Sequence, residues 1–463
     1  MGYMINQAVF DETFLKTGKF QHKTNVHYNL FPYNTKDQAD KILADFDGIL
    51  GAFFQDIYSV ETPNNISRDD ILREICDNVS FPENSLNRYK LENILRELYF
   101  DDDHSLKCNS LNTFKYISCA KNVSKISEYI VSTICDKEAI TMSLSEHNRA
   151  TSNVMDALVE KHLPELSKKK SGIEYLSLFP QIKELFTKDL VCLIENSNME
   201  FSDYIQLIAY YYFFYTSQVI LRLNEFFSPG NDIIPLYFCM GWEKTSQSRA
   251  CYSQGWRRLE DLLNEMFSHA VLLEMLNQTG LDKKYSYKDI LDEYNSSDDE
   301  RKCEIFSCIE NLKLKYRNNY ATDDDFKDNS KYAPSSYVKG DVTALIKEFH
   351  SDIMLQFKKS SRDRANEAFQ KGFFLFCKDN FLQNRKKNGL MLVLNEEQLV
   401  LFTKIIIGKR DKMRLNELFD EFSRRGIDMD RQTHECMVEY YERLNIIEKK
   451  SDSGDAQYVK GIL

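Results

Sequence analysis

Near the middle of the 463-residue chain, the eighteen residues Tyr204–Leu221 (YIQLIAYYYFFYTSQVIL) contain no charged side chain. A stretch of this length approaches what a membrane-spanning helix needs. However, it also contains five tyrosines, two glutamines, a threonine and a serine, whose polar tips suit a helix buried within a protein better than one in lipid. We therefore expect a buried helix within 200–227 and no membrane-spanning segment.

On both sides of this stretch, apolar residues recur with helical spacing. Ala39, Ile42, Phe46 and Ile49 lie three or four residues apart, which is typical of an amphipathic helix. Proline occurs only eight times in the chain, so few residues break such helices. We predict a mostly α-helical fold, with an irregular segment over 1–35 and further helices over 123–136, 145–162, 175–196 and 246–280.

The chain beyond residue 391 has a different pattern, in which short strands alternate with helices. Glu396–Ile407 reads as a helix, Met413–Leu415 as a short strand, and Asn416 and Asp430 can each cap a further helix. A polar turn that contains a glycine then separates two short strands. Helix, strand, helix, helix and hairpin is the order of a winged helix, which we predict for 391–463.

These patterns divide the chain into a multi-helical body and a C-terminal module. Between them the periodicity is broken by the run Asp323-Asp324-Asp325 and by Pro334-Ser335-Ser336, which favour a polar loop. The predicted parts are an N-terminal helical domain (1–165), a central helical domain with the tyrosine-rich helix and both tryptophans (166–316), a polar linker (317–340), connecting helices (341–390) and the winged-helix domain (391–463).

Charge and cysteine usage limit the class of protein. With 60 basic and 71 acidic residues the net charge is −11, whereas free-standing nucleic-acid binders are more often basic. The eleven cysteines are scattered without a CxxC pair, which is typical of free thiols in a reducing compartment. The N-terminus lacks the basic and apolar regions of a signal peptide. We therefore expect a cytoplasmic protein.

Acidic residues on the predicted third helix bear on whether the winged helix binds DNA. DNA-reading winged helices place this helix in the major groove and bind phosphate with basic wing residues. Here the helix carries Glu435, Glu439 and Glu442, and 391–463 holds 12 basic against 14 acidic residues. Phosphate would repel such a surface, so we favour protein interaction and keep direct DNA contact as the alternative. The basic candidates for contact with a partner or DNA are Lys409, Arg410, Lys412, Arg414, Arg431, Lys449 and Lys450.

Signatures of catalysis are absent from the sequence. No GxxxxGK[ST], GxSxG, HExxH or protein-kinase signature occurs. The eight histidines are dispersed, with His269 and His350 each alone on an expected helix, and no cysteine spacing fits a zinc site. Glu448 and Lys450 have a Glu-x-Lys spacing that occurs in metal-dependent nucleases, but we interpret them as solvated wing residues. We therefore predict no catalytic, cofactor-binding or metal-binding residue and expect that the chain is not an enzyme.

Both tryptophans lie in Gly241–Arg258, the densest mixture of aromatic, hydroxyl, glycine and arginine residues in the chain. Aromatic residues beside arginine anchor interfaces or stack on bases, and they also fill buried helix corners. If Glu243–Leu263 is one helix, then Ser246, Arg249 and Ser253 share a face that suits phosphate or partner carboxylates. Alternatively, both indole rings pack under the tyrosine-rich helix. The candidates for contact with a partner or DNA are Trp242, Glu243, Ser246, Arg249, Tyr252, Trp256, Arg257 and Arg258.

Two motifs carry a resemblance to a known protein family. The matching residues are Pro235-Leu236-Tyr237-Phe238, Trp242-Glu243-Lys244, Ser246, Ser248-Arg249, Tyr252, Gly255-Trp256 and the ending Glu448-Lys449-Lys450-Ser451-Asp452-Ser453-Gly454-Asp455-Ala456-Gln457-Tyr458-Val459. At these positions the chain resembles DNA phosphorothioation-dependent restriction proteins of the DptG type. The motifs cover a small part of the chain, and its length and helical body also agree with that family.

The resemblance implies a subunit of a bacterial defence system. In such systems a companion pathway replaces a non-bridging phosphate oxygen of host DNA with sulfur, and DptF, DptG and DptH act together on DNA that lacks this mark. DptF and DptH resemble ATPases or helicase-like translocases, whereas DptG has no nucleotide-binding motif, in agreement with the missing P-loop here. The chain would then be a non-catalytic bridging subunit that meets double-stranded DNA within the complex, without a cofactor or a membrane.

Two alternatives to a bridging role stay open from the sequence. The chain is a cryptic metal-dependent nuclease subunit of the same system, or it is a winged-helix DNA-binding regulator of transcription. Loss of plasmid integrity that depends on a metal would distinguish the first alternative. Salt-sensitive, sequence-specific binding of a short duplex by 391–463 would distinguish the second.

Overall fold

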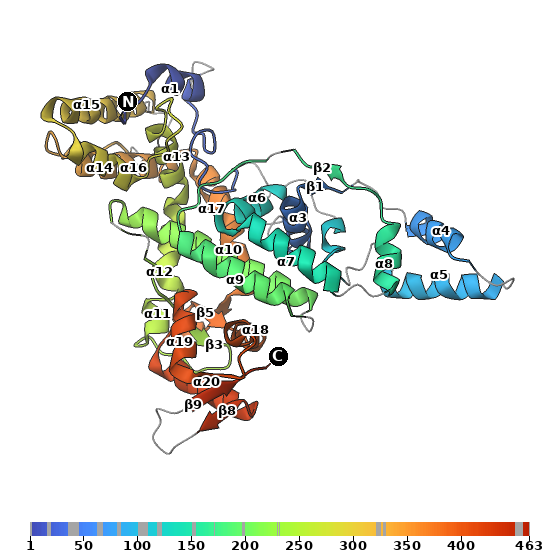
Figure 1. Ribbon diagram of the computed structural model, residues 1–463. Helices are drawn as coiled ribbons and strands as arrows, with labels where there is room; N and C mark the ends of the chain where they lie inside the picture. The colour runs from blue at the N-terminus through green and yellow to red at the C-terminus, as the bar shows by residue number, and fades with distance from the viewer. Residues whose placement is uncertain are drawn as a thin grey trace.

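A computed structural model of the chain shows a mostly α-helical protein with a few small sheets (Figure 1). The helical body is followed by a C-terminal part. Apart from β1 and β2, every strand among the described residues either belongs to this part or pairs with a strand of it. The residues that the structure describes are 2–15, 20–35, 46–62, 68–80, 85–100, 110–117, 123–150, 154–170, 172–196, 200–228, 230, 232–320, 326, 330–449 and 457–462.

Helix α10 (Phe201–Glu225) runs through the middle of the molecule and is buried along most of its length (Figure 1). Its tyrosine hydroxyls are all hydrogen-bonded. For example, Tyr210 donates to the backbone oxygen of Arg425 at 2.6 Å, and Tyr211 donates to Asp189 at 2.6 Å. The expectation of a buried helix is therefore confirmed. Among the described residues, no helix combines the length and the apolar character that crossing a membrane requires.

Helices that precede α10 in the chain surround one end of it. Helix α3 (Phe46–Tyr58) packs on α6 (Ser124–Ile134), while α9 (Pro180–Ile194) packs on α6, on α7 (Lys137–Ala150) and on α10. Aromatic rings from several of these helices meet edge to face in the core, a geometry that their ring quadrupoles favour.

A second, smaller apolar core lies away from α10. It is formed by α4 (Arg68–Asn78), α5 (Ser85–Tyr99) and α8 (Val154–Lys161), around Ile75 and Leu95. These three helices extend to one side of the molecule (Figure 1). Three short elements connect this region to the body: the antiparallel strands β1 (Val60–Glu61) and β2 (Ser167–Lys168), and the 3-10 turn η1 (Phe114–Tyr116).

A lobe on the other side of α10 contains the next helices of the chain. It consists of α13 (Met266–Leu276), α14 (Tyr287–Ser296), α15 (Asp299–Asn319) and α16 (Val342–Lys358) (Figure 1). Helix α13 is buried at every position and packs on α16. Helix α17 (Asp363–Asn380) follows and returns the chain to the body.

The N-terminal segment also belongs to this lobe. Helix α1 (Gln7–Phe14) begins after Asn6, whose side chain accepts from the backbone of Ala8 at 3.0 Å. The prediction that 1–35 is irregular is therefore wrong at this helix, because a cap and a buried aromatic pair, Phe10 and Phe14, stabilise it.

The predicted polar linker (317–340) begins too early, because 317–319 belong to α15, and its residues 330–340 lie against this lobe. The hydroxyl of Tyr332 donates to Gln356 of α16 at 3.0 Å. The ammonium of Lys313 in α15 donates to Ser335 at 3.1 Å. These contacts hold the segment on α15 and α16.

A four-stranded sheet that we did not predict joins the middle of the chain to its C-terminal part. Its strand order is β4-β5-β3-β7, with bounds Leu382–Asn384, Leu390–Leu394, Leu236–Met240 and Ile427–Met429. The central strand β3 runs parallel to both of its neighbours, in registers that pair Cys239 with Val393 and Phe238 with Met429. The edge strand β4 pairs antiparallel with β5.

The C-terminal elements follow the predicted order. They are α18 (Glu396–Ile407), β6 (Lys412–Arg414), α19 (Leu415–Arg424), α20 (Arg431–Arg443), β8 (Ile447–Lys449) and β9 (Gln457–Lys460). Strand β7 between α19 and α20 is an addition to that order. Strands β6, β9 and β8 form an antiparallel sheet in that order. Asp430 caps α20, as its position predicted, by accepting from the backbone of Thr433 at 3.1 Å. The predicted cap Asn416 is wrong, because α19 begins at Leu415 and Asn416 lies inside it.

The predicted stretch 246–280 is helical over most of its length, but it is not one helix, because the structure breaks it into short pieces. These are α11 (Ala250–Ser253), α12 (Trp256–Glu260), η2 (Asp261–Glu265) and then α13. The first break is at Gly255, where an added Cβ would lie 2.6 Å from the backbone oxygen of Tyr237 in β3. Close packing against β3 therefore interrupts the helix, and Ser246, Arg249 and Ser253 do not share one helical face.

Candidate functional site

The segment with both tryptophans packs against the start of α20. Arg249 lies in the interior, where its guanidinium pairs with Glu243 and with Asp430. Its Nε donates to Asp430 Oδ2 at 3.0 Å, and its Nη2 donates to the hydroxyl of Thr433 at 2.7 Å. Arg249 and Glu243 therefore connect this segment to the C-terminal part and are not presented to solvent.

Asp430 has two roles in this network. Its carboxylate caps α20 and also accepts from Arg249. Burial acts to raise the pKa of Asp430, but the hydrogen bonds from Arg249 and Thr433 outweigh burial and hold that pKa below its ordinary value. The carboxylate therefore stays ionised and keeps the two segments together at neutral pH.

The two indole rings have different surroundings. Trp256 is 1% exposed and lies in the main core, with its ring centroid 6.0 Å from that of Phe374. Trp242 is partly buried, and its ring lies 5.0 Å from that of Tyr440 in α20. Trp256 is therefore a core residue, whereas Trp242 covers one side of α20.

The remaining candidates of this segment lie at the surface. The guanidinium of exposed Arg257 lies over the ring of Tyr252, 5.1 Å from its centroid. Half-buried Arg258 donates to the backbone oxygen of Pro235 at 3.3 Å. The hydroxyl of exposed Ser246 bonds that of Ser248 at 2.9 Å. Of the three arginines, only Arg257 presents most of its charge to solvent.

Most of the basic candidates in the C-terminal part are already paired with carboxylates. The pairs are Arg431 with Glu435 (2.9 Å), Lys449 with Glu442 (2.6 Å), Arg410 with Glu417 (3.0 Å), Lys409 with Glu195 (2.8 Å) and Lys412 with Glu448 (3.0 Å). Arg414 is exposed at the end of β6 and has no ion pair with the described residues. Lys450 lies outside the described residues. Exposed Arg443 and Lys460 also have no ion pair with the described residues, so the positive charge of this surface is paired only in part.

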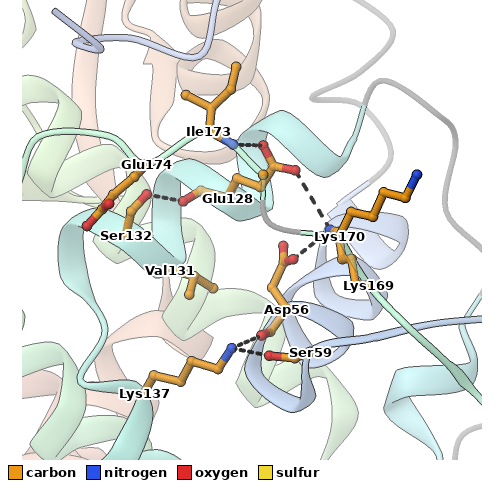
Figure 2. A pocket seen from close by; sticks show the side chains of 11 residues that line it. Asp56, Ser59, Glu128, Val131, Ser132, Lys137, Lys169, Lys170, Ile173 and Glu174 are labelled. Carbon is orange, nitrogen blue, oxygen red and sulfur yellow. Dashed lines mark hydrogen bonds and ion pairs between the residues drawn. The ribbon is translucent and has the colours of Figure 1, made fainter.

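A pocket between α3, α6 and the strand β2 also collects charged side chains (Figure 2). Lys169 lies between two carboxylates, with Nζ 2.5 Å from Asp56 and 3.9 Å from Glu128. Lys137 donates to the backbone oxygen of Asp56 and to Ser59, at 2.6 Å each. Figure 2 shows dashed lines from the ammonium of Lys169 to both carboxylates. The cluster is therefore an internally neutralised ion-pair group.

Two histidines that stand alone in the sequence are neighbours in the structure. The ring centroids of His269 (α13) and His350 (α16) are 4.0 Å apart, and Glu265 at the end of η2 lies beside them. The ligand atoms of these three residues all lie within 4.8 Å of one another. Sequence analysis missed this cluster because the two helices that carry the histidines are far apart in the chain.

Comparison with known proteins does not identify a family. No protein-family model matches the chain, and no curated protein matches it significantly.

Proposed function

We propose that this protein is a non-catalytic bridging subunit of a bacterial DNA phosphorothioation-dependent restriction complex. The complex would act in the cytoplasm on DNA that lacks the sulfur mark, together with DptF-like and DptH-like ATPase or helicase subunits. The proposal rests on the resemblance of 235–256 and 448–459 to DptG-type proteins. The acidic balance and the absence of a nucleotide-binding motif from the sequence support a subunit that works beside motor proteins.

The C-terminal elements support a winged-helix docking module within that subunit. Helix α18, strand β6, helices α19 and α20 and the β8–β9 hairpin follow the order of a winged helix. The sheet order β6-β9-β8 places the hairpin beside β6, as the wing requires. The module would present α20 and the wing to a partner.

The pairing of charges on α20 is the observation that carries the docking role. Glu435, Glu439 and Glu442 are exposed on this helix, and the basic side chains of Arg431 and Lys449 are engaged by two of them. A DNA phosphate would meet carboxylates here, and Trp242 covers another side of the helix. A partner protein with a basic patch fits this surface better, because complementary charge guides association.

A charge reversal on α20 tests the proposal. We would co-express the chain with the two ATPase-type subunits and measure assembly by size-exclusion light scattering. Glu439→Lys places a like charge opposite the expected basic patch, so we expect binding to weaken at least about tenfold. Deletion of 391–463 is less informative, since it removes β5 and β7, both of which pair with β3.

The matched control is Glu367→Lys, which reverses an exposed glutamate on α17 without touching α20. We expect this variant to assemble like the wild type. Equal assembly by both variants would contradict docking through α20. If no complex forms and the chain alone binds duplex DNA, through exposed Arg257 or Arg414, the bridging role is wrong. Metal-dependent nicking of plasmid by the chain alone would favour a nuclease subunit instead.

A further inference from the structure

We infer that Glu265, His269 and His350 form a binding site for a divalent transition-metal ion of the zinc class, which ties α13 to α16. This site is independent of the proposed bridging function. Two imidazoles and one carboxylate are a common ligand set for zinc and for non-haem iron, whereas magnesium and calcium prefer oxygen ligands alone.

The local geometry brings the three ligands together. Glu265 and His269 are four residues apart at the junction of η2 and α13, so they project from the same face. His350 reaches them from α16, which packs against α13. A tetrahedral zinc ion with bonds of about 2.0–2.1 Å needs ligand atoms about 3.3 Å apart. The ligand atoms lie within 4.8 Å of one another and the imidazole rings stack at an interplanar angle of 27°, so binding requires the side chains to rotate until their lone pairs converge on one ion.

The burial and hydrogen bonding of the two imidazole rings support a ligand at this site. His269 is 0% exposed and His350 is 3% exposed, and the Nε2 atom of each has no hydrogen-bond partner in the described part of the chain. An unsatisfied buried polar group costs about 1–3 kcal/mol, so native structures rarely retain two of them side by side. A metal ion between the Nε2 atoms would satisfy both.

The surroundings also hold His269 in the form that binds metal. Its Nδ1 lies 3.0 Å from the hydroxyl of Tyr287, in α14. If Nδ1–H donates to this oxygen, the Nε2 lone pair is free for a metal, which is the usual support for a histidine ligand.

One nearby charge opposes a bound cation. The positive charge of Lys358 is close enough to interact electrostatically with both Glu265 and His350. Its side chain is exposed, so solvent screens its repulsion of a bound cation. Glu265 is half-buried. The carboxylate supplies the negative charge that offsets the ion, and its partial exposure gives the ion a way in.

Direct metal binding by the full chain tests the inference. The protein is stripped with a chelator, titrated with Zn²⁺ by calorimetry and analysed for bound metal after gel filtration. We expect about one equivalent of zinc, a rise in Tm of a few degrees, and no response to Mg²⁺. With Co²⁺ as the probe, we expect visible d–d bands without thiolate charge transfer. Absence of binding, or a thiolate band, would overturn the site.

Three variants locate the ion. Glu265→Gln changes a half-exposed position and is expected to fold, with zinc affinity at least about tenfold weaker. His350→Gln should abolish binding of the one equivalent of zinc. The control His434→Gln alters a half-buried histidine on α20, which stacks on Phe419, and should bind zinc like the wild type. Equal binding by wild type and Glu265→Gln would place the ion elsewhere, for example at exposed Cys303, and would refute the inference.

Discussion

Helices α10 and α13 are both buried in the core, but they treat their polar side chains differently. Each tyrosine hydroxyl of α10 has a hydrogen-bond partner in the protein. On α13, the Nε2 of His269 and the hydroxyl of Ser268 have none among the described residues. Similar apolar burial thus accompanies fully bonded tyrosine hydroxyls in α10, where the hydroxyl of Ser217 is an exception among the described residues, and an unpartnered imidazole nitrogen in α13. The bonded tyrosines indicate a structural role, whereas the imidazole nitrogen of His269, beside that of His350, indicates where a ligand binds.

The largest effect is expected where the network around α10 contains charge. Arg425 is 1% exposed, and its guanidinium donates two hydrogen bonds of 2.7 Å to Asp189, which also accepts from Tyr211. Arg425→Met leaves this carboxylate buried without its counter-charge. We expect the free energy of unfolding to fall by about 3–5 kcal/mol, measured by denaturant titration.

The double variant Asp189→Leu with Arg425→Met is the control for this prediction. Removing both charges should recover most of the loss, since a buried ion pair contributes little more than an apolar pair of similar volume. If the double variant is as unstable as the sum of the two single variants, the pair is not coupled and the interpretation of the network around α10 fails.

A second prediction concerns the lobe that contains α13, where the charged groups are well paired. Glu348 of α16 accepts from buried Lys313 and from Arg317. Burial acts to raise the pKa of Glu348, but the hydrogen bond from Lys313 and its other partners lower it to about 2. A carboxyl group whose pKa is lower in the folded state stabilises the protein at pH values above its unfolded-state pKa. This stabilisation is lost as the pH falls, here between about pH 5 and pH 2.

We therefore expect Glu348→Gln to lower the free energy of unfolding by about 2 kcal/mol at pH 7 and to flatten its fall below pH 5. Burial and the charge of Glu348 both raise the pKa of neighbouring Asp352, so the substitution also removes this repulsion, which keeps the net effect below the full shift. Unfolding measured at pH 3 and pH 7 checks this. If the free energy of unfolding of the variant falls with pH as steeply as that of the wild type, other carboxylates dominate acid unfolding.

A third prediction compares a buried, hydrogen-bonded tyrosine hydroxyl of α10 with the hydroxyl of an exposed tyrosine. Tyr210→Phe removes the hydroxyl that donates to Arg425, so its backbone oxygen loses a partner. We expect a loss of about 1–2 kcal/mol in thermal or denaturant unfolding. A loss no larger than that of an exposed Tyr89→Phe would contradict the view that these hydroxyls stabilise α10.

The smallest effect is expected at hydroxyls without a partner. Ser217 on α10 and Ser268 on α13 are buried, and the hydroxyl of each has no partner among the described residues. Replacing either by alanine should change the free energy of unfolding by no more than about 0.5 kcal/mol, in the stabilising direction. A loss above 1 kcal/mol at Ser268 alone, on the order of one hydrogen bond, would indicate that its hydroxyl has a ligand that α13 binds.

Local patterns in the sequence predicted local structure well. Helix α18 matches its predicted bounds, and α20 begins after Asp430, because apolar periodicity and a capping carboxylate are both visible in a short window. The buried helix α10 was recognised from its uncharged, tyrosine-rich composition. The prediction of an irregular N-terminus was wrong at α1. This helix depends more on burial against the lobe, which the sequence does not show, than on its cap Asn6, which the sequence does show.

Features that depend on distant contacts could not be read in this way. Strands β3, β5 and β7 are three to five residues long and pair across large separations, so no window contains two of them. The break at Gly255 reflects a close approach to β3, and the meeting of His269 with His350 depends on how α13 and α16 pack. Arg249 was a candidate for contact with DNA, but a single sequence does not reveal its pairing with Asp430.

The central strand β3 has a consequence for synthesis of the chain. Cys239 in β3 and its neighbour Leu392 in β5 are 153 residues apart in the chain. The other strand that pairs with β3, β7, comes later still. At a ribosomal rate of about 5–20 residues per second, β3 would wait several seconds or longer for its neighbours to emerge. A nascent chain at this stage exposes an apolar strand with two open edges, which makes it a natural client for a chaperone and a target for aggregation.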